Sequence, residues 1–236
     1  MFRILFISFT LLCISVTSLV VVLVNYILRF VGLKRLVHIY IWPVSQLFAN
    51  CVLLASGIKI SVLGKENIPT ERYYCIVSNH QTFIDFVILA HVFPSTIGYI
   101  AKKSVKYIPI LNIWLSEIGC IFIDRNKREQ SIAQIQLHSQ KLQHQQCIHI
   151  FPEGTRSNGA QINKFKIKGL QTILDVNPIL LPCTIVNSYQ LNNRFKAARI
   201  DVVISKAIDC ELINQVEKDN MITTLEHIIA QPLIIA

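Results

Sequence analysis

A long uncharged segment near the start of the chain restricts its fold more than any other feature. Between Arg3 and Arg29 no charged residue occurs at positions 4–28. About 20 apolar residues are enough for a helix to cross a bilayer. A cleaved signal peptide would have an apolar core of roughly 7–15 residues before its cleavage site, whereas here the apolar run continues through Val20–Val24. The segment therefore predicts a retained membrane helix.

A second uncharged stretch covers residues 36–58, but it is more polar than the first. It carries His38, Pro43, Gln46 and Asn50, so a second span, a re-entrant helix and a helix lying in the interface all stay open. We favour partial insertion, in which two helices seat the protein on one leaflet. Each of these arrangements makes the lipid bilayer a partner of the chain.

Positive charges around the first segment predict its orientation. Arg29, Lys34 and Arg35 follow it, whereas Arg3 and the amino terminus precede it. Because Lys and Arg are enriched on the cytoplasmic side of membrane helices, this bias places the remainder of the chain in the cytoplasm.

The composition favours the same surroundings. The 236 residues are 52% hydrophobic and 16% charged, whereas soluble domains average roughly 25% charged residues. The net charge of +9 suits nucleic acid, an anionic membrane surface or a phosphorylated small molecule. Since no long run of Lys and Arg and no nucleic-acid motif occurs, we expect membrane and phosphate, and no nucleic acid. The seven cysteines form no C-x-x-C motif, which argues against a zinc or redox site.

From about Lys59 the pattern becomes that of an α/β domain. Short runs rich in β-branched and aromatic residues predict strands at 58–63, 73–77, 98–101, 119–123, 147–151, 179–185 and 200–204. Helices are predicted at 83–92, 127–145, 168–175 and 222–230. Strands that alternate with helices imply a mixed, mostly parallel sheet covered on both faces. We therefore divide the chain into anchoring helices at 1–57 and an α/β domain at 58–236.

A histidine and an acid stand where the second predicted strand gives way to a helix. Residues 76–86 read IVSNHQTFIDF, with His80 in the turn and Asp85 in the first turn of the helix. If the histidine folds back over the helix start, Asp85 accepts a hydrogen bond from one ring nitrogen and leaves the other free as a general base. The alternative is a surface histidine near a helix cap, with an acid favoured there by the helix dipole.

A second motif follows the predicted strand 147–151. Residues 150–157 read IFPEGTRS. Arginine is suited to bidentate phosphate binding, and Thr155 together with turn amides can complete a cradle for an anion. Taken alone, the motif fits a strand-terminating turn with a solvated Glu–Arg pair better than it fits a binding site.

Two further motifs complete the pattern. Gly119–Arg125 reads GCIFIDR after a lysine-rich stretch, Lys102–Lys106, and Leu180–Ile185 reads LLPCTI. With these motifs in this order, residues 58–205 resemble the 1-acylglycerol-3-phosphate acyltransferases of the glycerolipid acyltransferase superfamily.

Each motif matches a block of that family. His80 and Asp85 match its N-H-x-x-x-x-D motif, which is a weak signal by itself, and Phe151–Ser157 matches its F-P-E-G-T-R-S block, which is a strong one. Gly119–Arg125 is similar to the second block and Leu181–Cys183 to the fourth, proline-containing block.

The resemblance implies an enzyme and a reaction. Acyl-coenzyme A or an acyl carrier protein thioester would give a fatty acyl group to the free hydroxyl of 1-acyl-sn-glycerol-3-phosphate, which makes phosphatidate. No metal and no cofactor other than this co-substrate is implied. The implied location is the bacterial inner membrane or the endoplasmic reticulum, with the catalytic domain on the cytoplasmic side.

The resemblance also implies roles for individual residues. His80 would be the general base and Asp85 the residue that orients it. The set implied to bind the lysophospholipid acceptor comprises Glu153, Gly154, Thr155 and Arg156, with Arg125 and Lys103 as further contacts to its phosphate.

Some residues depart from the family pattern and keep alternatives open. Pro109 is followed by Ile110–Asn112 where many members carry a glycine, and the stretch 163–169 reads NKFKIKG instead of the usual Pro-Phe-Lys-x-Gly. The acceptor could therefore be another lysophospholipid or glycerol-3-phosphate. An alternative of another class is an inactive protein that binds anionic lipid. No G-x-S-x-G or H-E-x-x-H occurs, which disfavours a serine hydrolase and a metallohydrolase.

Overall fold

A mixed sheet forms the centre of the structure, a computed structural model that describes residues 2–70, 72–143, 146–192 and 198–235. Within these residues the sheet has eight strands, ordered β1-β7-β6-β2-β5-β3-β4, with β8 paired to β6. The strands are β1 (Lys59–Leu63), β2 (Tyr74–Ser78), β3 (Ile97–Lys102), β4 (Ile121–Ile123), β5 (Cys147–Ile150), β6 (Ile179–Val186), β7 (Arg199–Ile204) and β8 (Ile208–Asp209).

Most neighbouring strands run parallel. β4, β3, β5, β2 and β6 form one parallel set, whereas β7 and β8 run antiparallel to β6 and β1 runs parallel to β7. Every residue of β2, β5 and β6 is buried, as expected for central strands covered on both faces. The carboxyl ends of the five parallel strands therefore meet along one edge of the sheet, which we call the catalytic edge.

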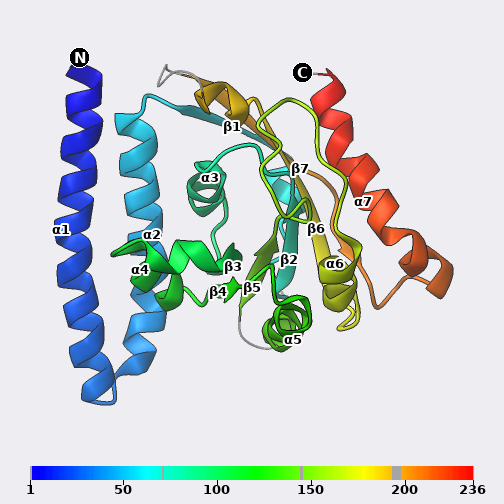
Figure 1. Ribbon diagram of the computed structural model, residues 1–236, viewed down its shortest axis with the longest axis horizontal. Helices are drawn as coiled ribbons and strands as arrows, with labels where there is room; N and C mark the ends of the chain where they lie inside the picture. The colour runs from blue at the N-terminus through cyan, green and yellow to red at the C-terminus, as the bar shows by residue number, and fades with distance from the viewer. Residues whose placement is uncertain (1, 71, 144–145, 193–197, 236) are drawn as a thin grey trace.

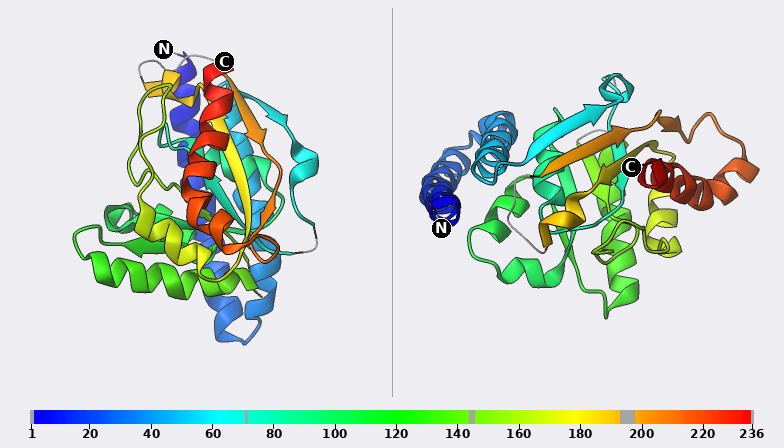
Figure 2. Two further views of the ribbon diagram at one scale, coloured as in Figure 1. Left: turned by 90° about the vertical axis from the view of Figure 1, so that its right-hand side faces the viewer. Right: turned by 90° about the horizontal axis from the view of Figure 1, so that it is seen from above.

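Helices cover both faces of the sheet (Figure 1). Buried side chains of α2, α3 and α4 pack on one face, and those of α5, α6 and α7 pack on the other. The view from above in Figure 2 shows the sheet between these two layers, with α1 outside α2. The helices are α1 (Phe2–Phe30), α2 (Lys34–Ala55), α3 (Asp85–Val92), α4 (Leu111–Glu117), α5 (Arg128–Ser139), α6 (Ile167–Leu174) and α7 (Gln215–Ile235), with short 3₁₀ helices η1 (Lys65–Asn67), η2 (Lys103–Tyr107), η3 (Gln140–Gln143) and η4 (Ser188–Asn192).

The first two helices are long and apolar enough to cross a membrane, and they differ in burial. In the most apolar part of α1 only 6% of the residues are buried, against 33% in α2. α1 therefore exposes apolar side chains around nearly its whole circumference, whereas α2 turns one face to the domain. The predicted division between 1–57 and 58–236 stays a prediction, since α2 contributes to the core of the domain.

Side-chain hydrogen bonds fasten α2 to the α/β domain. The indole Nε1–H of Trp42 and the amide of Gln46 both donate to the carbonyl of Phe93, at 3.2 and 3.0 Å. Trp114 Nε1–H of α4 donates to Ser45 Oγ at 2.9 Å. Because buried polar groups are costly unless they are paired, these contacts fix where α2 lies on the domain.

α1 is joined to α4 by a polar contact within an otherwise apolar helix. Asn25 is 1% exposed and donates to Glu117 Oε2 at 3.0 Å. Arg29 forms an ion pair with the same oxygen at 2.8 Å. The carboxyl end of α1 is therefore anchored to α4.

The proline of the fourth motif lies in a buried central strand. Proline lacks the N–H that a strand ladder needs, so this position is unusual. β8 pairs with β6 at Ile179 and Leu180, and β7 pairs with it only from Cys183 onward. Pro182 thus lies between two antiparallel partners, and its carbonyl accepts a hydrogen bond from Ser205 N–H at 2.9 Å.

The predicted fold class is confirmed, and two helices differ from their predictions. No element was predicted for residues 104–118, where α4 lies; it begins after Ile110, whose φ of 66° is rare for a β-branched residue. The last helix covers Gln215–Ile235 rather than the predicted 222–230. Its first turns were missed because they are polar and exposed. The end of the predicted helix 127–145 includes residues 144–145, which lie outside the described residues.

Candidate active site

Residues from three of the sequence motifs and from the lysine-rich stretch emerge along the catalytic edge. His80 follows β2, Glu153 follows β5, Lys103 follows β3 and Arg125 follows β4. β2 and β5 are direct neighbours, and β3 and β4 follow in the sheet order. In open α/β sheets, ligands bind at this edge of the sheet. The parallel topology therefore brings together residues that lie between positions 80 and 153 of the chain.

The histidine and the acid of the first motif are in contact. His80 Nδ1 lies 2.9 Å from Asp85 Oδ2. Asp85 is the first residue of α3 and is completely buried, whereas the His80 side chain is 20% exposed. Since a carboxylate only accepts hydrogen bonds, Nδ1 carries the proton in the neutral ring and Nε2 has a free lone pair. Among the described residues Nε2 has no hydrogen-bond partner, so it is available to a ligand.

Asp85 is held by further donors. Its Oδ2 accepts the backbone N–H groups of Gln81 and Thr82 at 2.7 and 2.8 Å. Its Oδ1 accepts the hydroxyls of Thr82 and Ser188 at 2.9 and 2.6 Å. Every oxygen of this carboxylate is therefore fixed, and its position at the start of a helix favours the negative charge.

The F-P-E-G-T-R-S block holds the backbone of His80 from both sides. The N–H of His80 donates to Glu153 Oε1 at 2.6 Å, and the N–H of Ser157 donates to the carbonyl of His80 at 2.7 Å. Glu153 is 1% exposed, and its second oxygen accepts the N–H of Asn163 at 2.8 Å. Burial raises the pKa of Glu153, against the two N–H hydrogen bonds, which lower it. The contacts favour a positioning role for Glu153 over the predicted contact with the acceptor.

The next three residues of the block reach the surface. Gly154 has a φ of 68°, and a Cβ there would lie 2.8 Å from atoms of Lys166, so the turn requires glycine. Thr155 and Arg156 are exposed. No described residue forms an ion pair with Arg156, which leaves its guanidinium free for an anionic ligand.

Aromatic rings pack against the side chain of His80. The ring of Phe151 stacks on the His80 imidazole, with centroids 3.8 Å apart and planes inclined by 15°. His149 packs edge-on against Phe151 at 4.1 Å and its Nε2 lies 2.8 Å from Ser78 Oγ. Burial, together with the neighbouring His80, lowers the pKa of His149 well below its ordinary value. His149 is therefore neutral, and only His80 of this pair is placed to exchange protons with a ligand.

We expect acid to destabilise the fold through a second buried histidine. Burial lowers the pKa of His138 from 6.5 to about 4. The stability that comes from keeping this ring neutral is complete above pH 6.5 and is lost as the pH falls towards 4, at a cost of roughly 3 kcal/mol. Thermal unfolding of His138→Gln in detergent should therefore depend less steeply on pH in this window than that of the wild type. Equal slopes would contradict this assignment.

The two basic residues predicted to be further phosphate contacts lie beside each other in the sheet order. Lys103 Nζ forms an ion pair with Asp124 Oδ2 at 3.2 Å, and Arg125 is the exposed residue that follows. They emerge from β3 and β4, on the far side of β5 from His80. The structure thus places them on the catalytic edge, and their role in binding stays a prediction.

Three residues of this site were not predicted from the sequence. The side-chain amide of Asn79 forms two hydrogen bonds with the backbone of Ile185. Its Oδ1 accepts the N–H of Ile185 at 2.8 Å and its Nδ2 donates to the carbonyl at 2.9 Å, which extends the contact of β2 with β6. Ser188 donates to Asp85, and Asn163 donates to Glu153. Ser188 could have been found, because it follows the end of a predicted parallel strand and such strands end at the same edge.

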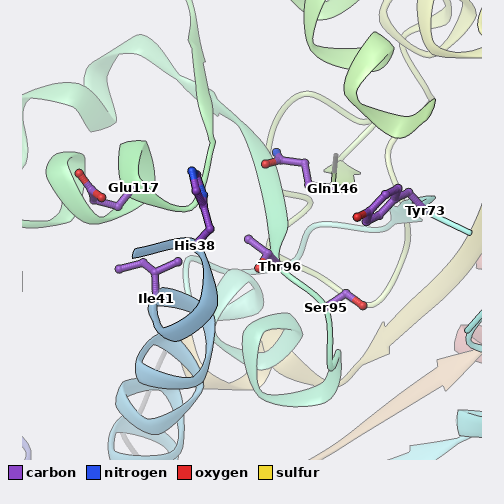
Figure 3. Close-up of a pocket in the computed structure, with 7 residues that line it drawn as sticks. All are labelled: His38, Ile41, Tyr73, Ser95, Thr96, Glu117 and Gln146. Carbon is purple, nitrogen blue, oxygen red and sulfur yellow. The ribbon is translucent and has the colours of Figure 1, made fainter. Parts of the chain in front are cut away.

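A cavity of about 460 Å³ lies away from this edge (Figure 3). His38 and Ile41 of α2 line one side of it, and the other side includes Tyr73, which precedes β2, and Thr96, which precedes β3. It therefore opens at the amino ends of the parallel strands, and none of its lining residues belongs to the four motifs. We place the active site at the catalytic edge instead, because the hydrogen-bonded His80 and Asp85 lie there.

Comparison with known proteins decides the family. A family model described as acyltransferase matches residues 59–186, which is more than half of the chain. The chain belongs to the acyltransferase family. The resemblance inferred from the motifs and the expected enzyme class are therefore confirmed. All of β1 to β6 and the His80 and Glu153 turns lie within the matched region.

Individual relatives of this acyltransferase agree with the family. A 1-acyl-sn-glycerol-3-phosphate acyltransferase of Borreliella burgdorferi is 28% identical over 87% of this chain and 79% of its own. A protein of the same name from Saccharomyces cerevisiae is 30% identical over 56% of this chain, and the match spans only 43% of that relative's length. The crystal structure of the 1-acyl-sn-glycerophosphate acyltransferase PlsC from Thermotoga maritima superposes with a TM-score of 0.73 at 21% identity, over 94% of this chain and 96% of that one. This likeness supports the same fold.

Proposed function

We propose that this acyltransferase transfers a fatty acyl group from a thioester donor to the free hydroxyl of 1-acyl-sn-glycerol-3-phosphate, which gives phosphatidate. The observation that carries the proposal is the hydrogen bond between His80 and Asp85. It leaves Nε2 of His80 free at the catalytic edge, where Arg156 also lies. The relatives from Borreliella burgdorferi and Saccharomyces cerevisiae bear the name of this activity.

His80 acts as the general base of this reaction. Its Nε2 takes the proton of the acceptor hydroxyl as the oxygen attacks the thioester carbonyl carbon. The tetrahedral intermediate then collapses, the carbon–sulfur bond breaks and the thiolate receives the proton from the imidazolium. Asp85, fixed by four donors besides His80, stabilises that imidazolium and holds the ring in orientation. A thioester is already activated, so a base and correct positioning are sufficient.

A direct attack is favoured over an acyl-cysteine intermediate. Cys75, Cys147 and Cys183 lie close to the motifs, but each is at most 1% exposed. Burial raises the pKa of each thiol above its ordinary value. Because the thiolate is the nucleophilic form, none of these side chains is suited to accept the acyl group. We propose no cofactor besides acyl-coenzyme A or an acyl carrier protein thioester.

Arg156 binds the phosphate of the acceptor in this proposal, helped by Thr155. Arg156→Ala is expected to raise the acceptor KM at least about tenfold with a smaller change in kcat, because a charge-assisted hydrogen bond is worth roughly 1.5–3 kcal/mol. Steady-state kinetics with varied lysophosphatidate measure this change. Arg199→Ala, which changes an exposed arginine at the start of β7, is the matched control. An unchanged acceptor KM would remove Arg156 from the phosphate site.

The two amino-terminal helices hold the enzyme on one leaflet of the membrane, with the catalytic domain on the cytoplasmic side. α1 presents apolar side chains to lipid, and α2 cannot be surrounded by lipid because one of its faces packs on the domain. Both acyl substrates are lipids or carry lipid chains, so this arrangement keeps the catalytic edge near them. Arg29, Lys34 and Arg35 at the turn between the helices suit an anionic membrane surface.

A panel of acceptors tests the substrate. The purified enzyme in liposomes is supplied with radiolabelled oleoyl-coenzyme A and with lysophosphatidate, glycerol-3-phosphate, lysophosphatidylcholine, lysophosphatidylglycerol or lysophosphatidylethanolamine. We expect label in phosphatidate, with the highest kcat/KM for lysophosphatidate. A preference for another acceptor would keep the mechanism and replace the substrate. Binding to vesicles of anionic lipid without transfer to any acceptor would instead favour the inactive lipid-binding protein.

A further inference from the structure

A second cavity, of about 510 Å³, lies along the outer edge of β4, the last strand of the sheet order. η2 and α4 border it on one side and α5 on the other. It is within the size range of small-molecule sites. Its lining residues that can bind a ligand's polar groups are Lys103, Lys106, Lys141, Gln130, Gln134 and His138.

The cavity has an excess of positive charge. Asp124 is the acidic residue in its lining, and it is already paired with Lys103 at 3.2 Å. Lys106 and Lys141 form no ion pair with any described residue. Two ammonium groups that face a common cavity without a counter-charge make it suited to an anion, above all to phosphate.

One ring nitrogen of a buried histidine in the lining has no hydrogen-bond partner among the described residues. His138 is 1% exposed, and its Nε2 lies 3.4 Å from the carbonyl of Gly98. If Nε2–H donates to that carbonyl, Nδ1 is left as an acceptor, and no described residue donates to it. A buried polar atom without a hydrogen bond is costly. A ligand with an N–H or O–H group would satisfy it.

We propose that this cavity binds the phosphorylated nucleotide of the coenzyme A donor. Lys106 and Lys141 contact its phosphate groups, and His138 Nδ1 accepts a hydrogen bond from its base or ribose. This inference rests on the proposed function for the identity of the donor. β4 is three strands from β2, so the cavity is displaced from the His80 strand by about 14 Å. The extended pantetheine arm of the donor spans that separation and brings the thioester to His80.

The first test measures binding without catalysis. Calorimetry measures the binding of adenosine 3′,5′-bisphosphate to the enzyme in detergent. This compound is the nucleotide of the donor without its pantetheine arm and without the second phosphate of the 5′-diphosphate. We expect the double variant Lys106→Ala/Lys141→Ala to bind it at least tenfold more weakly. The control is Lys59→Ala/Lys206→Ala, which removes the same charge from exposed positions on the opposite side of the sheet and should bind it as the wild type does. Absence of binding to the wild type, or equal binding to the double variant, would overturn the proposal.

The second test separates donor binding from the other substrates. The double variant should raise the KM for acyl-coenzyme A about tenfold and leave the lysophosphatidate KM unchanged. An S-acyl-pantetheine donor, which has no nucleotide, should be used equally well by variant and wild type. Equal impairment with both donors would overturn the proposal. So would a loss of binding to vesicles of anionic lipid with nucleotide binding intact, because the cavity would then be a headgroup site.

These tests distinguish a failure of the cavity assignment from a failure of the proposed function. Suppose that the wild type transfers no acyl group to any acceptor but binds the nucleotide, and that the double variant binds it weakly. The cavity assignment then stands and the reaction must be revised. If the wild type makes phosphatidate but the double variant retains nucleotide binding, the reaction stands and the cavity assignment is wrong.

Discussion

His80→Ala is expected to lower kcat for acyl transfer by about 10² to 10⁴, the range that a positioned general base contributes. The imidazole is the group whose free Nε2 is available at the catalytic edge, and no other described histidine is placed to replace it. His149 lies beneath Phe151, where it is 1% exposed and held neutral by burial. Initial rates at saturating donor and acceptor measure the change.

The control for this variant must show that the loss is chemical. His227→Ala changes an exposed histidine of α7 and should retain full activity. The His80→Ala protein should bind vesicles of anionic lipid as well as the wild type does, since α1 and α2 are untouched. If its kcat stayed within twofold of the wild-type value, His80 would not be the base.

Glu153→Ala is expected to be nearly as damaging, for a different reason. The carboxylate holds the backbone N–H groups of His80 and Asn163, at 2.6 and 2.8 Å, in a site that is 1% exposed. Removing it leaves both N–H groups without their acceptor. The cost is about 1–3 kcal/mol for the part-buried N–H of His80 and less for the N–H of Asn163, an exposed residue that water can reach. The backbone of His80 then keeps its hydrogen bond with Ser157 but loses the one with Glu153. Because a small misplacement of a catalytic group can lower the rate about 10²-fold, we expect kcat to fall by that factor or more.

The kinetic pattern distinguishes this role from acceptor binding. A positioning role predicts a fall in kcat with little change in the acceptor KM, together with a lower thermal unfolding midpoint. A rise in the acceptor KM with kcat and stability unchanged would instead restore Glu153 to the acceptor site that the family resemblance implied. Glu66→Ala, at an exposed position in η1, controls for the loss of a carboxylate.

Every strand except the two-residue β8 was predicted, and the central strands were the easiest to predict because their apolar runs are continuous. β2, β5 and β6 are buried at every residue, and a run of this kind has few alternatives to a central strand. α4 escaped prediction because it has only seven residues and begins at Ile110, in a backbone conformation that no propensity rule favours for isoleucine. The start of α7 escaped because its first turns expose polar residues.

The active-site pair was predictable, whereas the residues that hold it were not. His80 and Asp85 are five positions apart, so local geometry was enough to anticipate their contact. Ser157 donates to His80 from 77 positions later in the chain, and Ser188 donates to Asp85 from 103 positions later, so only the parallel topology brings them close. The family resemblance implied that Glu153 binds the acceptor, and an acid beside an arginine in a turn gives no sign that its carboxylate is buried under another loop.

We propose that the acyl group passes directly from the thioester to the acceptor with His80 as the base. Quenched-flow mixing of the wild-type enzyme with radiolabelled oleoyl-coenzyme A and lysophosphatidate tests it most directly. We predict that label enters phosphatidate without a burst of label on the protein, and that phosphatidate formation is lost in His80→Ala. Label that accumulates first on the protein, or phosphatidate formed at the wild-type rate by His80→Ala, would contradict the account.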